Sequence, residues 1–470
     1  MTSPSIERDA RSHRTARLPG RLVIPIALGT LLQALNSSMI AVALVQIRDA
    51  FHAGASASWL ISGLYLATAV GAPTMGRLAD VIGPRRVFVG GLVVIAVAAT
   101  AAPFAPNIGT LILCRVLLGI GTSAPYPAGL AMIRAEADRL GLDNVSGGLG
   151  VLTVAGQVAV AFGPALGGLL VRFAGWPAIF LVNLPFVLVA AFFALRHLPR
   201  DHARTPAAPR VTARAAVRKL DVGGLLLFST AMTSLMLVLL SLTDRPQWYL
   251  LPVFALLAVL LILWERRVDE PFVDVRLLAA NRGLSFTYLR TALTYVAFYA
   301  IFYGVPAWLE QGRGLDPGTT GLVMLPLAAV GVVTTTVAAR LVRQRGPRTL
   351  LVIGSIVLAG AALVLTRVDA TAPIIGLVAL SAVLGLPNGF NSMGNQTSLY
   401  RSAPPDRIGT ASGLYRSSQY VGANLAAAML ELTFAGPSTD PGLHRTALAV
   451  FAIGLVLAVT AVTSKHLRRG

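Results

Sequence analysis

The stretch that decides the fold is Gly76-Arg77-Leu78-Ala79-Asp80-Val81-Ile82-Gly83-Pro84-Arg85-Arg86, which places one acid and three arginines between two long apolar runs. Residues 59–75 before it and 87–105 after it carry no Asp, Glu, Lys or Arg. A continuous helix through Gly83-Pro84 is excluded, because proline lacks the amide donor and pushes the preceding residue out of the helical region. The stretch therefore predicts a tight, charged turn that joins two membrane helices.

The composition of the whole chain supports a membrane protein. Its 470 residues are 55% apolar and 13% charged, with a mean hydropathy of +0.71, which lies outside the range of soluble domains. Apolar runs of about 20 residues recur along the chain, each long enough to cross the hydrocarbon layer as a helix. Because these runs are continuous and do not alternate, we predict helices and not a barrel, and hence an all-α polytopic membrane protein.

The formal net charge of +19 is explained by the membrane. The basic residues are scattered in short loops between apolar runs, where they can contact anionic lipid headgroups. No nucleic-acid partner is therefore predicted. The single cysteine, Cys114, excludes an intramolecular disulfide, and no Cys/His cluster predicts a metal site or cofactor. Residues 1–21 carry five arginines and run directly into an apolar segment, which predicts an uncleaved first span.

About fourteen candidate spans can be placed on the chain by this reasoning. They begin near residues 22, 58, 87, 108, 147, 177, 222, 248, 284, 318, 349, 372, 409 and 447. With the N-terminus inside, about 31 of the 39 Lys and Arg residues lie on the cytoplasmic side, as the positive-inside rule requires. We therefore expect both termini in the cytoplasm and the chain in the cell inner (plasma) membrane.

Two halves of the sequence resemble one another. Arg77-Leu78 and Gly83-Pro84-Arg85 recur at one constant offset as Arg340-Leu341 and Gly346-Pro347-Arg348. Such internal repeats are typical of secondary transporters, whose substrate site lies between the halves. The predicted organisation is a cytoplasmic tail (1–21), a six-helix bundle (22–196), a cytoplasmic linker (197–220), two inserted helices (221–265), a cytoplasmic loop (266–283), a second six-helix bundle (284–465) and a tail (466–470).

The chain resembles the major facilitator superfamily, and more narrowly its fourteen-span drug:proton antiporters of the EmrB/QacA type. The loop at 76–86 matches the superfamily signature between spans two and three, and Arg115 with Gly119 and Gly121 matches its span-four motif. Gly163-Pro164-Ala165-Leu166-Gly167-Gly168 matches the antiporter motif of span five. The fourteen-span branch is indicated by Trp176 with Ile179-Phe180-Leu181-Val182-Asn183-Leu184-Pro185, by Asp221-Val222-Gly223, and by Pro271-Phe272-Val273-Asp274-Val275-Arg276-Leu277.

The resemblance implies that the opening loop is a conformational switch that locks the outward-facing state. Its residues are Gly76, Arg77, Asp80, Gly83, Arg85 and Arg86, and we expect the three arginines to pair with Asp80. The alternative is that the loop only anchors the topology. The second copy of the loop has Arg343 in place of the acid, so a switch would be carried by the N-terminal copy.

Three further positions are assigned to proton coupling. Arg115 lies inside span four, where an arginine is costly unless it faces a partner or a cavity, and the resemblance gives it a part in proton transfer; snorkelling is the alternative. Glu431 continues the polar stripe of Arg416, Tyr420 and Asn424 on one face of span thirteen, and is our first candidate for a proton-binding carboxylate. Its alternative is a position at the external end. Glu310, at the end of span nine, is the second candidate.

The antiporter motif contributes Gly163, Pro164, Gly167 and Gly168, which allow a kink and a close helix approach, and small-residue packing is the alternative reading. Span one departs from the resemblance, because Asn36 stands where the fourteen-span relatives have an aspartate. Gln33 and Asn36 could contact substrate or Arg115, or make an interhelical packing contact. The predicted substrate-binding residues are Gln33, Asn36, Tyr295, Tyr299, Asn388, Asn391, Arg416, Tyr420 and Asn424, with core packing as the alternative for the aromatic pair.

These residues predict secondary-active, proton-coupled efflux of amphipathic or cationic small molecules by alternating access. A metabolite exporter or facilitator without proton coupling is the alternative, favoured by Asn36. Direct ATP use is not expected, since no Walker-type loop is present. An enzyme is not expected either, because all six histidines fall outside the spans. The expected partners are a small-molecule substrate, protons and the bilayer, and the expected state is a monomer without metal, cofactor or catalytic residues.

Overall fold

We describe the protein from a computed structural model, which describes residues 18–53, 59–142, 145–199, 201, 220–241, 246–434 and 439–467. Most of the predicted N-terminal tail (1–21) and most of the predicted linker (197–220) lie outside the described residues. Helices make up the secondary structure of the described part, and it contains no strand. The predicted all-α fold is therefore confirmed for the described chain.

The first half begins with α1 (Gly20–Ala50) and α2 (Trp59–Ile82) and continues through α3 (Pro84–Ala101), α4 (Ile108–Ser123), α5 (Pro125–Leu140), α6 (Ser146–Ala174), α7 (Ala178–Leu181) and α8 (Asn183–His197). Next come α10 (Val222–Ser241), α11 (Leu250–Glu265) and the short α12 (Val275–Ala280). The second half consists of α13 (Arg282–Ala307), α14 (Pro317–Leu365), α15 (Ile374–Ser402), α16 (Ile408–Phe434) and α17 (Asp440–Thr463).

Nine helical stretches of the described chain are long and apolar enough to cross a membrane by length and composition. The helices α2 and α16 are not among them, and α11 is a shorter apolar helix. Both α2 and α16 carry buried polar side chains, including Arg77 on α2 and Asn424 on α16, which lower their mean hydropathy. The predicted count of fourteen spans thus stays a prediction.

The repeated Gly-Pro turns have the same structure in both halves. Gly83 has φ 109° and Gly346 has φ 71°, a region that disfavours residues with a Cβ. A proline follows each glycine; Pro84 starts α3, and the corresponding proline follows the break within α14. The guanidinium groups of Arg85 and Arg348 then donate to main-chain carbonyls of α8 and α17, each at 2.7 Å. The repeat seen in the sequence is therefore a repeat of structure.

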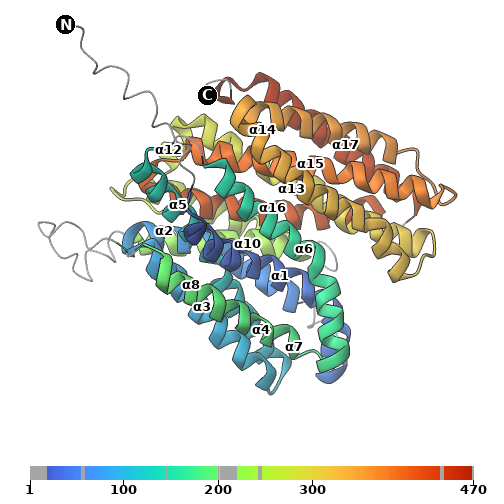
Figure 1. Cartoon of the computed structure of the whole chain (residues 1–470), viewed down its shortest axis with the longest axis horizontal. Coiled ribbons are helices and arrows are strands. Elements are labelled where there is room, and N and C mark those ends of the chain that lie inside the picture. Colours follow the sequence, from blue (N-terminus) through green and yellow to red (C-terminus); the bar gives the residue numbers. More distant parts are fainter. Residues whose placement is uncertain are drawn as a thin grey trace, which may run out of the picture.

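The helices form two bundles; one apolar core fills the first bundle and extends to residues of α13–α16, and another lies within the second bundle. In Figure 1 the blue-to-green helices α1–α8 lie together, as do the orange-to-red helices α14–α17. Fully buried Phe88 and Leu118 belong to the first core, and fully buried Trp308 and Val450 to the second. The bundles meet where α2 packs on α16 and where α6 packs on α14. A site built by both halves would lie at this interface between the bundles.

The two inserted helices are held to the chain that follows them by a buried carboxylate. Asp221 precedes α10 in a left-handed conformation with φ 46°. Its Oδ1 accepts hydrogen bonds from the backbone N–H of Gly224 at 3.0 Å and from Trp264 Nε1 at 2.8 Å, and its Oδ2 accepts from the N–H of Phe272 at 3.0 Å. The neighbouring acid Glu265, fully buried at the end of α11, accepts from the N–H of Val273.

We expect Asp221→Ala to lower the thermal unfolding midpoint of the purified protein by several degrees. The change leaves three donors without their charged acceptor, and each such hydrogen bond contributes about 1.5–3 kcal/mol. The measurement is a thermal unfolding curve in detergent. Asp269→Ala is the matched control, because Asp269 is exposed and lies near the same hairpin. Equal midpoints for the two variants would show that Asp221 does not hold the insert.

Candidate functional site

The two bundles touch most closely where α2 crosses α16. A Cβ atom at Gly76 would overlap the carbonyl oxygen of Gly409, and a Cβ at Gly413 would overlap the carbonyl oxygen of Ala72. Glycine is needed here because the two backbones approach without room for side chains. This end of the α2–α16 interface, which carries the predicted cytoplasmic loop, is therefore closed by backbone contact.

Asp80 stabilises the same crossing by hydrogen bonds. Its Oδ1 accepts from the backbone N–H of Gly409 at 3.0 Å, and its Oδ2 accepts from the N–H and the hydroxyl of Thr410 at 2.8 and 2.7 Å. The carboxylate thus lies at the N-terminus of α16, where unpaired amides and the helix dipole favour a negative charge. The partners of Asp80 therefore lie in the opposite half of the chain.

The predicted pairing of Arg85 and Arg86 with Asp80 is wrong. Their backbone N–H groups donate to the carboxylate of Asp201 at 2.9 and 3.0 Å, and the Arg86 side chain lies 3.9 Å from the same carboxylate. The physical reason is the break at Gly83, which starts a new helix and points its first free amides toward Asp201. Arg77 is buried and contacts Glu270, whose carbonyl accepts from it at 3.2 Å.

Arg115 is buried between the first, second and fourth helices of the first bundle. It is 1% exposed, its Nε donates to the Leu60 carbonyl at 2.9 Å, and its Nη2 donates to the Asn36 carbonyl at 3.3 Å. The side chain therefore does not snorkel, and main-chain carbonyls of α1 and α2 are its acceptors. Its predicted part in proton transfer stays a prediction.

The side chain of Asn36 does not reach the space between the bundles. Its Nδ2 donates to Asn183 Oδ1 at 2.5 Å and to the Leu32 carbonyl at 2.8 Å, and Asn183 donates back to Asn36 Oδ1 at 3.1 Å. Both amides are buried. Asn36 thus makes the interhelical contact that was the alternative reading, and its placement among substrate-binding residues is not supported.

The glycines of the antiporter motif lie against α1. A Cβ at Gly163 would overlap Ser38, and a Cβ at Gly167 would lie 3.2 Å from the Cα of Met39. These contacts explain why small residues are needed, since they let α1 and α6 approach at backbone distance. Gly168 is half-buried on the same helix, and the side chain of Pro164 lies outside the described residues.

One large cavity lies between the bundles, with an empty volume of about 1040 Å³ that includes solvent-open space. Helices of both halves line it, namely α1, α5 and α6 from the first and α13, α14, α15 and α16 from the second. Of the predicted substrate-binding residues, the cavity is lined by Gln33, Tyr295, Tyr299, Asn388, Arg416 and Tyr420.

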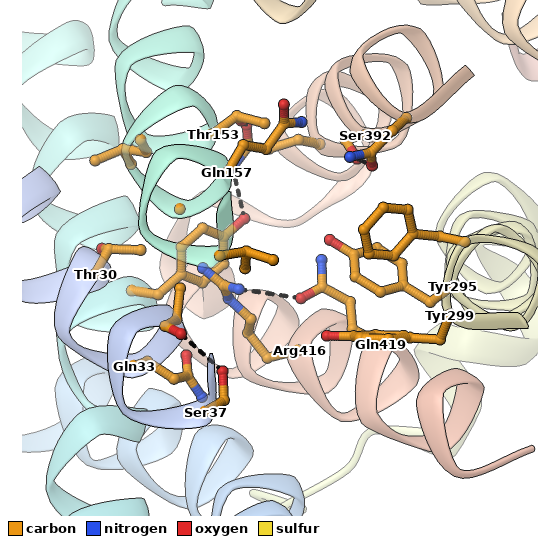
Figure 2. Close-up of a pocket in the computed structure, with 18 of the residues that line it drawn as sticks. Thr30, Gln33, Ser37, Thr153, Gln157, Tyr295, Tyr299, Ser392, Arg416 and Gln419 are labelled. Atoms are coloured by element: carbon orange, nitrogen blue, oxygen red, sulfur yellow. Dashed lines mark hydrogen bonds between the residues drawn. The ribbon is translucent and has the colours of Figure 1, made fainter. Parts of the chain in front are cut away.

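An aromatic wall on α13 forms one side of the cavity. Figure 2 shows Tyr295 and Tyr299 on one helix, facing across the cavity toward Gln33 and Ser37 of α1. The ring centres of Tyr295 and Tyr299 are 6.0 Å apart, and those of Phe298 and Phe302 stack at 5.5 Å. These rings, most of them tilted relative to one another, give the cavity an aromatic wall.

Figure 2 shows Arg416 on the side of the cavity opposite Tyr295 and Tyr299. The centre of its guanidinium lies 3.9 Å from the centre of the Tyr126 ring, and its Nη1 donates to Gln419 Oε1 at 3.1 Å. On the same helix, Tyr420 accepts a hydrogen bond from Gln33 Nε2, which joins α16 to α1. The polar stripe predicted on α16 therefore faces the cavity at Arg416 and Tyr420.

Three further predicted site residues lie elsewhere. Asn391 is buried against Gly354 and lines a smaller pocket, and Asn424 is buried, with its Nδ2 3.4 Å from the sulfur of Met236. Glu310 is exposed in the helical turn Trp308–Gly312, as a rim position requires. The side chain of Glu431 lies outside the described residues.

Several lining residues were missed by the sequence reasoning. They include Tyr126, Thr153, Gln157, Gln396 and Gln419. Gln396 donates to Tyr126 Oη at 3.0 Å and accepts from Thr153 Oγ1 at 2.6 Å, so it links the two bundles. The available signal was the density of amides in otherwise apolar segments, since Gln396 directly follows Asn395, and Gln419 directly precedes Tyr420.

Two helical bundles with a cavity lined by both are the architecture of multi-pass membrane transporters. The chain belongs to the Major Facilitator Superfamily, which it matches over residues 26–427.

Relatives and solved structures agree with this assignment. The MFS-type transporter YwoD of Bacillus subtilis is 34% identical over 87% of this chain and 89% of its own. The tetracenomycin C resistance and export protein of Streptomyces glaucescens is 28% identical over 90% of this chain and 77% of its own. The structure of the human organic anion transporter MFSD10 matches with a TM-score of 0.63 and 16% identity, over 94% of this chain and 100% of that one, and shows the shared fold.

Proposed function

We propose that this protein is a secondary-active exporter of amphipathic small molecules. The observation that carries the proposal is the cavity between the bundles, whose wall combines the α13 aromatics with amides and one arginine from both halves. A site with this mixture suits molecules that have an apolar body and a few polar groups. The resistance and export function named for the Streptomyces relative supports the direction of transport.

Alternating access fits the contacts between the halves. The α2–α16 crossing at Gly76, Gly409 and Asp80 closes the end that carries the predicted cytoplasmic loop. Rocking of one bundle against the other would break this crossing and open the cavity on that side. We further propose that the chain crosses the plasma membrane fourteen times in the EmrB/QacA arrangement, with both termini in the cytoplasm.

Proton coupling is part of the proposal, with Glu431 as its first carboxylate. Arg115 is buried beside α1 and α2, and Glu310 is exposed. Glu431 is the first candidate because it belongs to α16, a helix that also lines the cavity. Transport without proton coupling is the second candidate. It is favoured by one observation: among the described residues that line the cavity there is no Asp or Glu.

In proteoliposomes we expect substrate export to follow an imposed pH gradient in the wild type, and Glu431→Gln to lose this dependence while transport down a concentration gradient persists. An internal pH dye and a fluorescent aromatic substrate report the two fluxes in one experiment. Asp269→Asn is the matched control, because it neutralises an exposed carboxylate that does not line the cavity. Wild-type transport that ignores the pH gradient would establish the uncoupled alternative.

A further inference from the structure

The cavity has an unusual charge. Among the described residues that line it, Arg416 is the only one that carries a formal charge. The remaining polar groups are amides and hydroxyls, including those of Gln33, Gln157 and Asn388. A fixed positive charge repels organic cations and attracts anions, the more strongly where water is largely excluded.

Arg416 has capacity left for a ligand. Tyr126 covers one face of the guanidinium, and Gln419 accepts from Nη1, but Nε is buried without a hydrogen-bond partner among the described residues. No carboxylate of the described chain lies within ion-pair distance of Arg416, whereas Arg134 and Arg139 on α5 each have one. Arg416 is a half-buried cation without a counterion in a largely apolar cavity, and an anionic ligand would supply the missing partner.

A second polar group faces the same space. Both Nε2 and Oε1 of Gln157 are buried without hydrogen-bond partners among the described residues. Figure 2 shows Gln157 and Arg416 on the side of the cavity that is opposite Tyr295 and Tyr299. An amide with both atoms unused provides a donor and an acceptor to a carbonyl or hydroxyl of a bound molecule.

The apolar part of the cavity selects shape. The α13 rings at Tyr295, Phe298 and Tyr299 present a continuous aromatic surface. Offset stacking or edge-to-face packing on such rings favours a planar aromatic body over a branched aliphatic one. The cavity therefore has an aromatic wall on one side and a cation with amides on the other.

We infer that the substrates are planar aromatic monoanions, whose carboxylate or phenolate oxygen pairs with Arg416 while the ring system lies against α13. This inference rests on the proposed function, since it names the substrate class of the same cavity. It replaces the predicted preference for cations. An inside-negative potential of 100 mV itself favours the outside for such an anion by about 50-fold, so export would not need an acid in the cavity.

The test is binding of three matched probes to the purified full-length protein in nanodiscs without any gradient. The probes are anthracene-2-carboxylate, its neutral carboxamide and the cationic 2-(aminomethyl)anthracene, and fluorescence anisotropy gives each Kd. We expect wild type to bind the carboxylate at least tenfold more tightly than the cation. Arg416→Gln should weaken carboxylate binding at least tenfold, with less than a threefold change for the carboxamide.

Two variants complete the design. Arg416→Lys keeps the charge and should keep the preference for the carboxylate, and Arg172→Gln removes an exposed arginine beside Phe173 and should change nothing. Equal or tighter binding of the cation by wild type would overturn the inference, as would failure of all three probes to bind. Because these measurements use no gradient, a failure of the export proposal would appear only in the proteoliposome experiment and can be told apart.

Discussion

Asp80→Asn is expected to reduce transport at least tenfold while the protein still inserts into the membrane. The carboxylate accepts three hydrogen bonds at the start of α16, from two backbone N–H groups and the Thr410 hydroxyl. Asparagine has one oxygen and would turn its amide donors toward at least one N–H, and it also loses the charge that the helix terminus favours. As a result, the closed form of the α2–α16 crossing loses the hydrogen bonds that stabilise it.

The measurement is transport in vesicles, normalised to the amount of inserted protein. Asp138→Asn is the matched control, because Asp138 makes only a solvent-exposed ion pair with Arg134 at 3.3 Å on α5, and exposed pairs contribute little. Thr410→Val should give an intermediate loss, since it removes one of the three hydrogen bonds. A fully active Asp80→Asn protein would reduce the loop to an anchor of topology.

Gly76→Ala is expected to lower transport by a similar factor, but by steric overlap and not by loss of hydrogen bonds. The added methyl group would overlap the Gly409 carbonyl oxygen, which belongs to the backbone and cannot rotate away. The helices α2 and α16 could then no longer approach to their present distance. The closed form is destabilised, and the cavity should stay accessible from the cytoplasmic side. No charge or hydrogen bond is changed.

Accessibility can be read by maleimide labelling of a Ser412→Cys variant in inside-out vesicles. Ser412 is fully buried in α16, and the native Cys114 is 4% exposed, so labelling reports opening of the crossing. With Gly76→Ala the labelling rate should rise at least fivefold. Gly90→Ala is the matched control, because no atom lies within 4 Å of a Cβ at Gly90. Unchanged labelling with Gly76→Ala would mean that this contact does not govern closure.

The two predictions separate the parts of the crossing. Loss of transport in both variants, with raised labelling in both, would show that hydrogen bonding and backbone contact support one closed state. Raised labelling with Gly76→Ala alone would show that backbone approach decides closure and that Asp80 acts at another step of the cycle.

The sequence alone was sufficient for the class of fold and for the repeat. Long apolar runs leave helices as the structure that satisfies the backbone in a bilayer, and Gly83-Pro84 and Gly346-Pro347 break those helices for reasons within a few residues of each break. Arg115 was also located as a buried arginine, because an arginine inside an apolar run must find acceptors. These conclusions depend on local chemistry.

The site was predicted only in part, because helical spacing says which side chains share a face but not what that face meets. Gln33 and Asn36 lie three residues apart on α1, yet Gln33 lines the cavity and Asn36 binds Asn183 on α8. Arg416 and Asn424 belong to one polar stripe, and only Arg416 reaches the cavity. Packing between distant segments decides each case.

For this protein, the sequence by itself determined a helical membrane protein of two repeated halves, because burial of apolar runs and the stereochemistry of glycine and proline act within one segment. Only the tertiary structure decided that Asp80 binds the N-terminus of α16 and that Arg85 and Arg86 bind Asp201. It also decided that Arg416 is the one charged residue among the described residues that line the cavity. Those facts depend on contacts between residues hundreds of positions apart, which are fixed when the bundles pack together.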